Sequence, residues 1–491
     1  MVNQPPTDAG RSQSDIDDIV CQLEHTDAFT GIAEYMIQTG FDDMVRSNGS
    51  EAAKQLVTRF LLFSHRGGYP ASVIHLDLRG LIQNQMSITH PEYENRENGN
   101  ALNLPYLINK FVGPQFNGSL RDPRAELIRT AIILERMELP EVEKFKEAFL
   151  NATGFTYLEY INLCLEFKTL ADQGDGLISI EDAVALSIVD QSHPLSVISR
   201  TFEEHQQLVI DMNRARVAKE AGIEAADVTV ENLRGFHGLK TITSIETKPL
   251  IRGNVQGRDY LIAPLPDLLL AATSIQSMKW QIMGNMTSTE RKKVNNWMGD
   301  INEGYLASLV SAVEEIRITP FTNTIDLDED HHDESRADMI IETERYIVII
   351  EQKSRAVNLD FYFDEEKFEE AVDSVNDARD QIVATINDHR QYIADLQKPL
   401  IGIIVSDHPI RAFNSEGIPN VEGLLFVSVN CNYAELTNLL ISEFIDNEID
   451  EFYSLEDKHA SINRFPADVT ERQLKLTHHL MELNELDQAE D

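Results

Sequence analysis

The stretch RADMIIETERYIVIIEQKS, residues 336–354, decides the fold that we expect for the last third of this chain. Its apolar runs MII and IVII indicate two short buried strands. Asp338 opens the first strand, and Glu351 and Lys353 close the second. Because side chains alternate along a strand, Glu351 and Lys353 point to one face of the sheet while Gln352 points to the other. If the two strands form a hairpin, Asp338 lies close to Glu351.

Two carboxylates and an ammonium group at the end of a buried strand must be paired or bind a metal, because isolated charges are costly to bury. Neighbouring carboxylates repel each other, and a hard divalent cation such as Mg²⁺ relieves that repulsion. A bound metal lowers the pKa of its water and polarises a phosphate, while Lys353 would stabilise the phosphate or position the water. Phosphodiester hydrolysis needs these groups together, so we expect Asp338, Glu351 and Lys353 to be catalytic.

The segments on either side indicate a layered α/β unit. A helix is predicted at about residues 302–316 and a longer one at about 364–396. Further strands are predicted at NTIDLD before the stretch, and at PLIGIIVSD and GLLFVSVN after the long helix. The run IGIIV is apolar throughout, as expected of a central strand covered on both faces.

At these residues the sequence resembles the PD-(D/E)XK superfamily of restriction-endonuclease-like nucleases, over about Gly299–Asn430. Glu351 and Lys353 match the E-x-K element of that family, and Asp338 matches its aspartate, with Ala337 in place of the usual proline. The resemblance implies a restriction-endonuclease-like α-β-β-β-α-β core with a central mixed sheet. It also implies metal-dependent hydrolysis of nucleic acid, with Mg²⁺ or Mn²⁺ as the cofactor. The upstream stretch KPLIRGNVQGRDYLIAPLPDLLLA resembles a segment that precedes such domains in bacterial and archaeal proteins, which implies a role in defence or DNA processing.

The family often carries a metal-binding glutamate on the helix before the sheet. In GDINEGYLASLV, Glu303 stands in the matching place, so the resemblance implies Glu303, Asp338 and Glu351 as metal ligands. Glu314 and Glu315 compete for the same role. A charge on an exposed helix face remains an open alternative for Glu303.

Three further residues are candidates for contact with substrate phosphates. Arg336 and Arg355 flank the proposed triad. Gln381 lies on the long helix, where related nucleases often have a polar residue that assists the site. Pairing with nearby acids for the arginines, or a solvated helix face for Gln381, are the alternatives.

The charge of the chain limits how it can meet a polyanion. Its 491 residues include 82 acidic and 42 basic ones, a formal net charge of -40. This charge opposes loose attraction to nucleic acid, although a local basic groove or a bound metal can invert the field at a site. An acidic, salt-tolerant surface is an equally open interpretation.

The length suggests several domains, and the local patterns suggest where they divide. Helical periodicity dominates the first half, as in EAAKQLVTRFLLFS and SVISRTFEEHQQLVIDMNRARVAKEAG, and β-branched segments such as LKTITSIETKPLIRG follow. A further helix is predicted at about 265–286. We therefore predict a flexible tail (1–15), a mainly helical domain of unknown role (16–238), a connecting α/β segment (239–298), a PD-(D/E)XK-like nuclease domain (299–435) and an acidic helical C-terminal tail (436–491).

The remaining features concern location and partners. The three cysteines are far apart, which argues against a zinc ribbon or a disulfide framework. No apolar signal core or membrane-length apolar run is found, so we expect a soluble cytoplasmic protein. The expected partners are nucleic acid, DNA more than RNA, and a protein bound through the helical domain. Cutting both strands would suggest a homodimer. The alternative is a catalytically silent nuclease fold that acts as a binding module.

Overall fold

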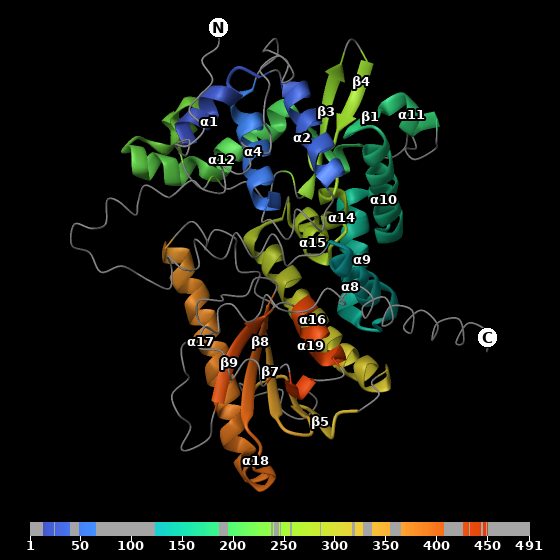
Figure 1. Cartoon of the computed structure of the whole chain (residues 1–491), viewed down its shortest axis with the longest axis vertical. Coiled ribbons are helices and arrows are strands. Elements are labelled where there is room, and N and C mark those ends of the chain that lie inside the picture. Colours follow the sequence, from blue (N-terminus) through green and yellow to red (C-terminus); the bar gives the residue numbers. More distant parts are fainter. Residues whose placement is uncertain are drawn as a thin grey trace. The chain divides into compact units, whose positions relative to one another are not determined.

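A computed structural model gives the structure of the chain (Figure 1). It describes residues 13–23, 25–39, 49–64, 123–185, 195–236, 239, 245, 247–255, 258–284, 286–316, 320–327, 336–353, 365–406, 426–431, 433–442, 445–447 and 449. Helices and strands both contribute, so the chain is a mixed α/β protein, and its described residues form two small mixed sheets.

The chain forms two compact units. In so far as the ranges are described, the first unit takes in 1–102, 118–127 and 147–285, and the second takes in 103–117, 128–146 and 286–491. The helices α8 (Pro123–Arg136) and α9 (Pro140–Thr153) contribute residues to both.

Helices make up most of the first unit. In chain order its elements are α1 (Gln13–Val20), α2 (His25–Thr39), α4 (Gly49–Phe63), α10 (Tyr157–Gln173), β1 (Leu177–Ser179), α11 (Ile180–Ala185), η2 (Leu195–Val197), β2 (Ser199–Thr201), α12 (Phe202–Ala221), η3 (Ala225–Asp227), η4 (Val230–Leu233), β3 (Leu250–Val255), β4 (Arg258–Ile262), α14 (Leu268–Ala271) and α15 (Ile275–Met283). The strands form one sheet in the order β1-β4-β3-β2, antiparallel except for the β2–β3 pair.

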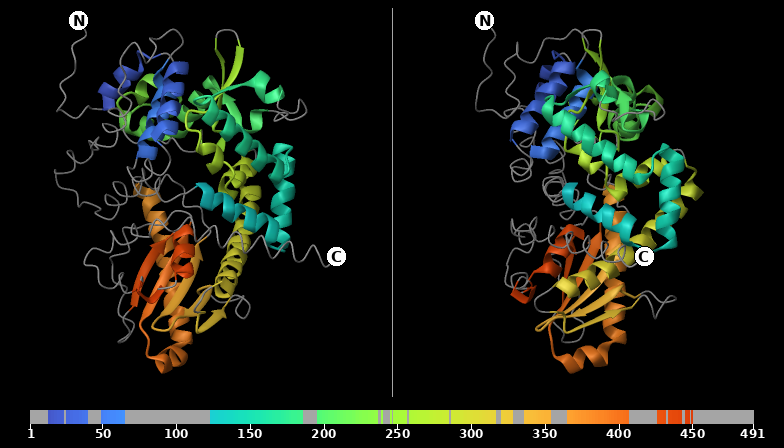
Figure 2. Two further views of the ribbon diagram at one scale, coloured as in Figure 1. Left: turned by 45° about the vertical axis from the view of Figure 1, so that its right-hand side comes forward. Right: turned by 90° about the vertical axis from the view of Figure 1, so that its right-hand side faces the viewer.

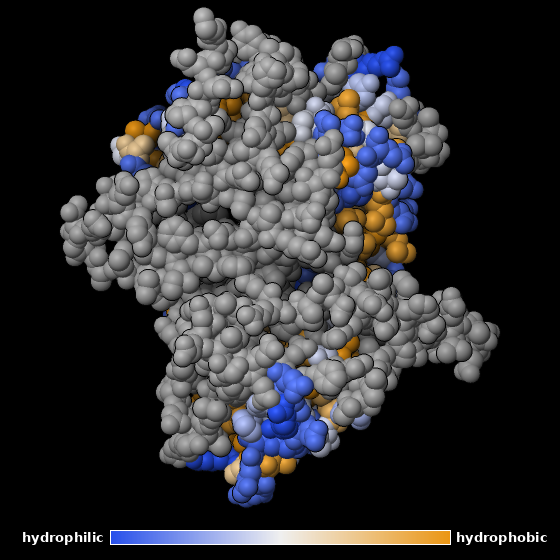
Figure 3. Space-filling view, viewed as in Figure 1, coloured by the Kyte–Doolittle hydropathy of each residue, from blue (hydrophilic) through white to orange (hydrophobic). Residues whose placement is uncertain are grey.

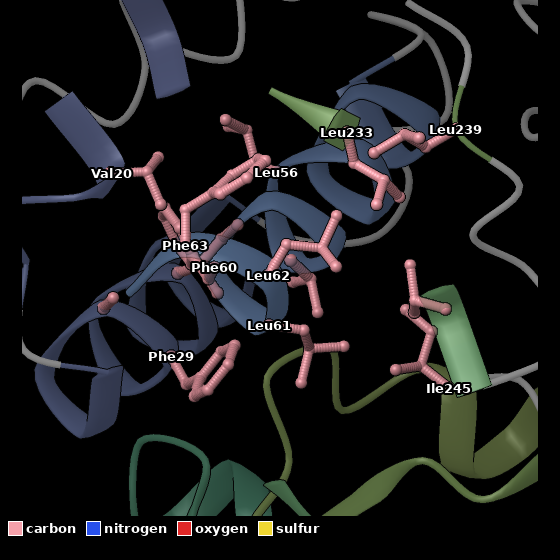
Figure 4. Close-up of a cluster of buried hydrophobic side chains, with 14 of the residues drawn as sticks. Val20, Phe29, Leu56, Phe60, Leu61, Leu62, Phe63, Leu233, Leu239 and Ile245 are labelled. Atoms are coloured by element: carbon pink, nitrogen blue, oxygen red, sulfur yellow. The ribbon is translucent and has the colours of Figure 1, made fainter. Parts of the chain in front are cut away.

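A hydrophobic core holds the helices of the first unit together. Figure 4 shows its centre, where Leu56, Phe60 and Phe63 of α4 lie among apolar side chains from other segments. Phe29 of α2 meets Phe60 edge to face, with the ring centroids 6.0 Å apart. These contacts bury the apolar face that the helical periodicity of the sequence predicts.

A buried ion pair lies within this helical region. Arg59 Nη1 is 3.1 Å from Asp17 Oδ2, and neither side chain is exposed. Arg59 also donates to the carbonyl oxygens of Leu233 and Phe236, and Asp17 accepts from the N–H of Gly235 at 2.7 Å. Burial lowers the pKa of Arg59 to about 10, although the charge of Asp17 opposes this shift. The pair therefore ties α1 and α4 to the segment after η4.

The second unit contains a five-stranded mixed sheet (Figure 1). Its order is β5-β6-β7-β8-β9, formed by β5 (Asn323–Asp326), β6 (Met339–Glu342), β7 (Ile347–Lys353), β8 (Leu400–Ser406) and β9 (Phe426–Cys431). Neighbours from β5 to β7 are antiparallel, while β7, β8 and β9 run parallel. All five strands were predicted from the sequence. The predicted hairpin joins β6 to β7, and the main chain of Thr343 donates to Tyr346 O at 2.9 Å in its turn.

Helices cover both faces of this sheet (Figure 2). Its helices are α16 (Ser288–Ile316), α17 (Glu365–Asp388), α18 (Arg390–Leu396) and α19 (Tyr433–Ile441). Ile347 and Ile349 of β7 pack with Ala378 and Ile382 of α17. The intervening Val348 is also buried, and α16 and α19 contact the sheet and each other. Because side chains alternate, α17 covers one face and α16 with α19 covers the other.

An arginine links the helices on the second face. The guanidinium of Arg129, in α8, lies 3.8 Å from the ring centroid of Tyr433 and 5.4 Å from that of Tyr305. Arg129 Nη2 also donates to Asn302 Oδ1 at 2.7 Å. All four side chains are buried, so this cluster fixes α16 beside α19.

The helix predicted at 302–316 is longer than expected, and the start predicted for it is wrong. Helix α16 begins at Ser288, and the polar stretch STERKKVNN forms its first turns. Thr287 precedes the helix, and its main-chain N–H donates to Glu290 Oε2 at 2.8 Å. The N–H of Glu290 donates in return to Thr287 Oγ1 at 3.4 Å. This reciprocal pair is a capping box, which starts a helix even in a polar sequence.

Two other predicted helices are interrupted. The helix predicted at 364–396 is α17 followed by α18, with a break at His389, whose φ of -93 and ψ of 16 are not helical. The helix predicted at 265–286 is α14 followed by α15, and the extended Ser274 caps the second helix by accepting from Ser277 N at 3.2 Å. In both places the hydrophobic periodicity of the sequence continues across a break in the helix, so periodicity alone predicts one helix where the structure has two.

The units divide the chain differently from the predicted segments. Strands β3 and β4, expected in the connecting segment, share a sheet with β1 and β2 of the region expected to be helical. The segment SVISRT ends in β2 rather than starting the helix. The predicted boundary at residue 299 falls inside α16, and α19 crosses the one at 435. Helix α1 begins at Gln13, within the predicted tail; residues 1–12 and 450–491 lie outside the described part.

Where the face in Figure 3 is coloured, hydrophilic residues alternate with smaller hydrophobic areas. No helix within the described ranges is both long enough and apolar enough to cross a membrane.

Candidate active site

The hairpin brings Asp338 directly beside the end of β7. Its main-chain N–H donates to Ile350 O at 3.0 Å, and its carboxylate Oδ2 accepts from the N–H of Gln352 at 2.5 Å. These two contacts bracket Glu351, so Asp338 and Glu351 lie opposite each other on neighbouring strands. The proximity of these two acids was predicted, and the strand pairing places them so.

Lys353 completes the group. Its Nζ is 2.6 Å from Glu351 Oε1, and it also donates to Gln381 Oε1 on α17. The side chain of Glu351 is 2% exposed and that of Lys353 is 20% exposed. Since α17 covers this face, Glu351 and Lys353 both point toward it, as strand alternation predicts. The carboxylate of this charge pair is therefore almost completely buried, whereas the lysine side chain remains partly exposed to solvent.

Helix α17 also holds the segment that leads into Asp338. Gln381 Nε2 donates to Arg336 O at 3.1 Å, and the side chain of Arg336 pairs with Asp388. Thr385 Oγ1 accepts from the N–H of Ala337 at 2.8 Å. Of the residues predicted to contact phosphate, Gln381 thus lies in the site, and Arg336 lies next to it in an ion pair.

The remaining predicted site residues either lie away from this group or fall outside the described part of the chain. Glu303 lies half-buried on α16, on the helix expected to carry it. Glu314 accepts from Thr324 Oγ1 on β5, which ties this competitor to the edge of the sheet. Arg355 and the side chain of Glu315 lie outside the described part. Among the described side chains, no group of three or more His, Cys, Asp or Glu is arranged to hold a metal ion, so Glu303 is not gathered with the other two acids.

The sequence missed residues that approach the site from other elements. In the parallel register of β7 and β8, Lys353 aligns with Ser406, and Glu351 aligns with Ile404. Aligned residues of neighbouring strands share a face, so the buried Ser406 stands next to Lys353 on the same face of the sheet. Neither Ser406 nor Thr385 carries a sequence signal that separates it from other buried hydroxyl residues.

A second buried glutamate–lysine pair lies at the opposite end of the same sheet. Lys398 Nζ is 2.7 Å from Glu342 Oε1, with side-chain exposures of 19% and 7%. Glu342 also accepts from the hydroxyl of Tyr392 at 2.9 Å, and Lys398 donates to Thr343 O at 2.6 Å. This pair resembles the one at Glu351 in distance and burial, but its contacts tie α18 and the loop after it to the hairpin turn.

The chemistry of the donors at Asp338 fits a hard divalent cation. Asp338 and Glu351 supply carboxylate oxygens, which are the ligands that Mg²⁺ prefers, and Mg²⁺ commonly takes one or two carboxylates and keeps several waters. Asp338 is half-buried, so one side of the pair is accessible to solvent. These two acids therefore match the needs of Mg²⁺ without a third protein ligand.

Comparison of the chain with protein-family models, with curated proteins and with solved structures finds no match. An inference of function for this chain must therefore rest on the geometry of its own residues.

Proposed function

We propose that the second unit has a restriction-endonuclease-like core of the PD-(D/E)XK type and hydrolyses phosphodiester bonds in nucleic acid with Mg²⁺ or Mn²⁺. The observation that carries this proposal is the joint placement of Asp338, Glu351 and Lys353 at one end of β6 and β7. A sequence pattern of two acids and one amine is common and is weak support by itself. It becomes stronger support for a nuclease site when the fold brings the three side chains together.

The sheet topology supports the same proposal. A helix, three antiparallel strands, a helix and a parallel strand follow one another as α16, β5, β6, β7, α17 and β8. This is the α-β-β-β-α-β order that the resemblance implies. Asp338 immediately precedes the second strand and Glu351 stands on the third, where the family carries its aspartate and its E-x-K element.

Each residue has a role that its contacts allow. Asp338 and Glu351 would hold the metal, without Glu303, which lies on α16 and is not gathered with them. When bound, the metal supplies a water of lowered pKa and polarises the phosphate. Lys353 would place its ammonium group against a phosphate oxygen, because it is the more exposed partner of its pair. Gln381 would orient that ammonium group through the hydrogen bond to its side-chain oxygen.

The proposed substrate is DNA rather than RNA, and the proposed role is in defence or DNA processing. The net charge of -40 opposes non-specific binding, so capture of DNA must depend on the metal and on local basic groups such as Arg336. The first unit would then recognise the substrate or a protein partner, and a homodimer would allow both strands to be cut.

A cleavage assay tests this function. Purified protein is incubated with plasmid DNA, single-stranded DNA and RNA, in the presence of Mg²⁺, Mn²⁺ or EDTA. We expect cleavage of DNA that needs the metal and is lost in Asp338→Asn, which keeps the size of the side chain but removes its charge. Absence of cleavage by the wild-type protein, or equal cleavage by the variant, would contradict the proposal.

A silent nuclease fold that serves as a binding module is the second candidate. The observation that favours it is the 2% exposure of Glu351, together with the contact of Lys353 that already neutralises this acid. In that case the charge pair stabilises the sheet and needs no metal. Binding of DNA or of a protein without cleavage, unaffected by Mg²⁺ and by Asp338→Asn, is the outcome that selects this candidate.

A further inference from the structure

A single face of α17 contacts both strands of the site. Gln381, Thr385 and Asp388 stand four and three residues apart, so they lie along one side of the helix. Gln381 binds Lys353 of β7, and all three residues bind the two residues before Asp338. The helix thus joins the lysine of the site to the segment that carries the aspartate.

Thr385 makes the most constrained of these contacts. It is completely buried, and its hydroxyl oxygen accepts from the N–H of Ala337 at 2.8 Å while donating to Gln381 O at 2.9 Å. Ala337 lies two residues before Met339, where β6 begins, and a side chain rather than a neighbouring strand accepts its N–H. A buried N–H must find an acceptor, so this hydroxyl fixes the position of the main chain just before Asp338 relative to α17.

We propose that Thr385 is a positioning residue, which sets Asp338 against Glu351 and Lys353 through its hydrogen bond to Ala337. This inference rests on the proposed function and adds a residue that the sequence pattern does not contain. Without the hydroxyl, the buried N–H of Ala337 loses its acceptor, and the segment relieves this by moving. A displacement of about 1 Å at a catalytic group lowers the rate on the order of 10²-fold.

Two substitutions at one position separate the hydroxyl from the volume of the side chain. Thr385→Val keeps the branched shape and removes the hydroxyl, and Thr385→Ser keeps the hydroxyl. Thr437→Val is the matched control, because Thr437 is also buried and donates to the carbonyl four residues before it, Tyr433 O, at 2.7 Å. Thr437 lies on α19, on the other face of the sheet, and no contact of it with the site is present among the described residues.

Three measurements are made on each variant: the cleavage rate, the Mg²⁺ concentration at half-maximal rate, and amide exchange of residues 336–342 without metal. In Thr385→Val we expect a rate at least about 10-fold lower, a higher half-saturating Mg²⁺ concentration and faster exchange. Thr385→Ser should restore all three, and Thr437→Val should leave them unchanged.

The failure of this inference differs from the failure of the function. An active wild-type protein with an equally active Thr385→Val variant overturns the inference alone. So does a loss of activity that Thr437→Val shares, because the cause is then general destabilisation. A wild-type protein that neither cleaves nucleic acid nor responds to Mg²⁺ overturns the proposed function, and the inference with it.

Discussion

The carboxylate of Asp338 accepts its hydrogen bond from the main chain of Gln352, with Oδ2 2.5 Å from the nitrogen. The donor belongs to the residue between Glu351 and Lys353, so this hydrogen bond ties the acid to β7 through the main chain. The identity of residue 352 is therefore free to change without loss of this bond.

Substitution of Gln352 tests that independence. Its side chain is 5% exposed, and neither amide atom has a hydrogen-bond partner in the described part of the chain. A buried polar group without a partner costs about 1 to 3 kcal/mol. We expect Gln352→Met to keep the cleavage rate and to raise the free energy of unfolding by about 1 kcal/mol, measured by urea denaturation. A strong loss of activity would show that the amide itself acts in the site.

The two glutamate–lysine pairs of the sheet provide a direct comparison of function with stability. They match in distance and burial, so Lys353→Met and Lys398→Met should each destabilise the second unit, by about 3 to 5 kcal/mol, since a buried carboxylate loses its partner. We expect only the first substitution to abolish cleavage, measured well below the unfolding temperature. Equal loss of activity in both variants would mean that Lys353 acts through stability alone.

Binding of Mg²⁺ should stabilise the second unit through Asp338 and Glu351. At ten times the dissociation constant, a bound ligand adds about 1.4 kcal/mol, which raises the melting temperature of a unit of this size by roughly 3 to 6 °C. Glu351→Gln should remove this rise, whereas Glu342→Gln should keep it because Glu342 lies at the other end of the sheet. A rise that persists in Glu351→Gln would place the metal elsewhere.

The sequence predicts the strand that carries the site because two local patterns agree there. The apolar run IVII requires a strand covered on both faces, and the period of two then fixes the side of Glu351 and Lys353. The contacts of Thr385 could not be predicted, because they join residues 48 positions apart and depend on how α17 is rotated against the sheet.

Two helix starts carry a local capping signal in the sequence. The capping pattern Thr-x-x-Glu stands at Thr287 and again at Thr201, where Glu204 N donates to Thr201 Oγ1 at 3.1 Å. Both mark helix starts that hydrophobic periodicity alone misplaces. By contrast, Arg59 looks like an ordinary charged position of an amphipathic helix, and only the fold shows that it is buried against Asp17.

The buried pair of Asp17 and Arg59 in the first unit predicts that substitution of Asp17 lowers the free energy of unfolding strongly, whereas substitution of the neighbouring Asp18 lowers it little. Asp17→Ala leaves the guanidinium of Arg59 buried without its carboxylate, and we expect a loss of about 3 to 5 kcal/mol in the free energy of unfolding. Asp18→Ala is the control, since Asp18 pairs with Arg234 but is 55% exposed, and surface pairs contribute little. Urea denaturation followed by amide exchange in α1 and α4 measures both. Equal effects of the two substitutions would contradict the role assigned to the pair.

His205 of α12 predicts a dependence of stability on pH. Burial lowers its pKa to about 3, with a further lowering by the charge of Arg200, and its Nε2 lies 3.3 Å from Leu250 O. In the unfolded chain the imidazole has a pKa of about 6.5. Between these two values the unfolded state binds a proton that the folded state does not, so stability is fully present above about pH 6.5 and falls as the pH decreases toward 3.

Substitution isolates this contribution from that of the many acidic residues. One proton accounts for a slope of up to about 1.4 kcal/mol per pH unit in that window. We expect His205→Gln, whose amide can donate to the same carbonyl, to unfold less steeply with acid than the wild-type protein. His389→Gln in the second unit, at a half-buried position, serves as the control. The measurement is the difference in urea midpoint between variant and wild type at pH 4.5, 5.5 and 7.5, followed by amide exchange in α12. A difference that does not change with pH would mean that the pKa of His205 is the same in the folded and the unfolded state.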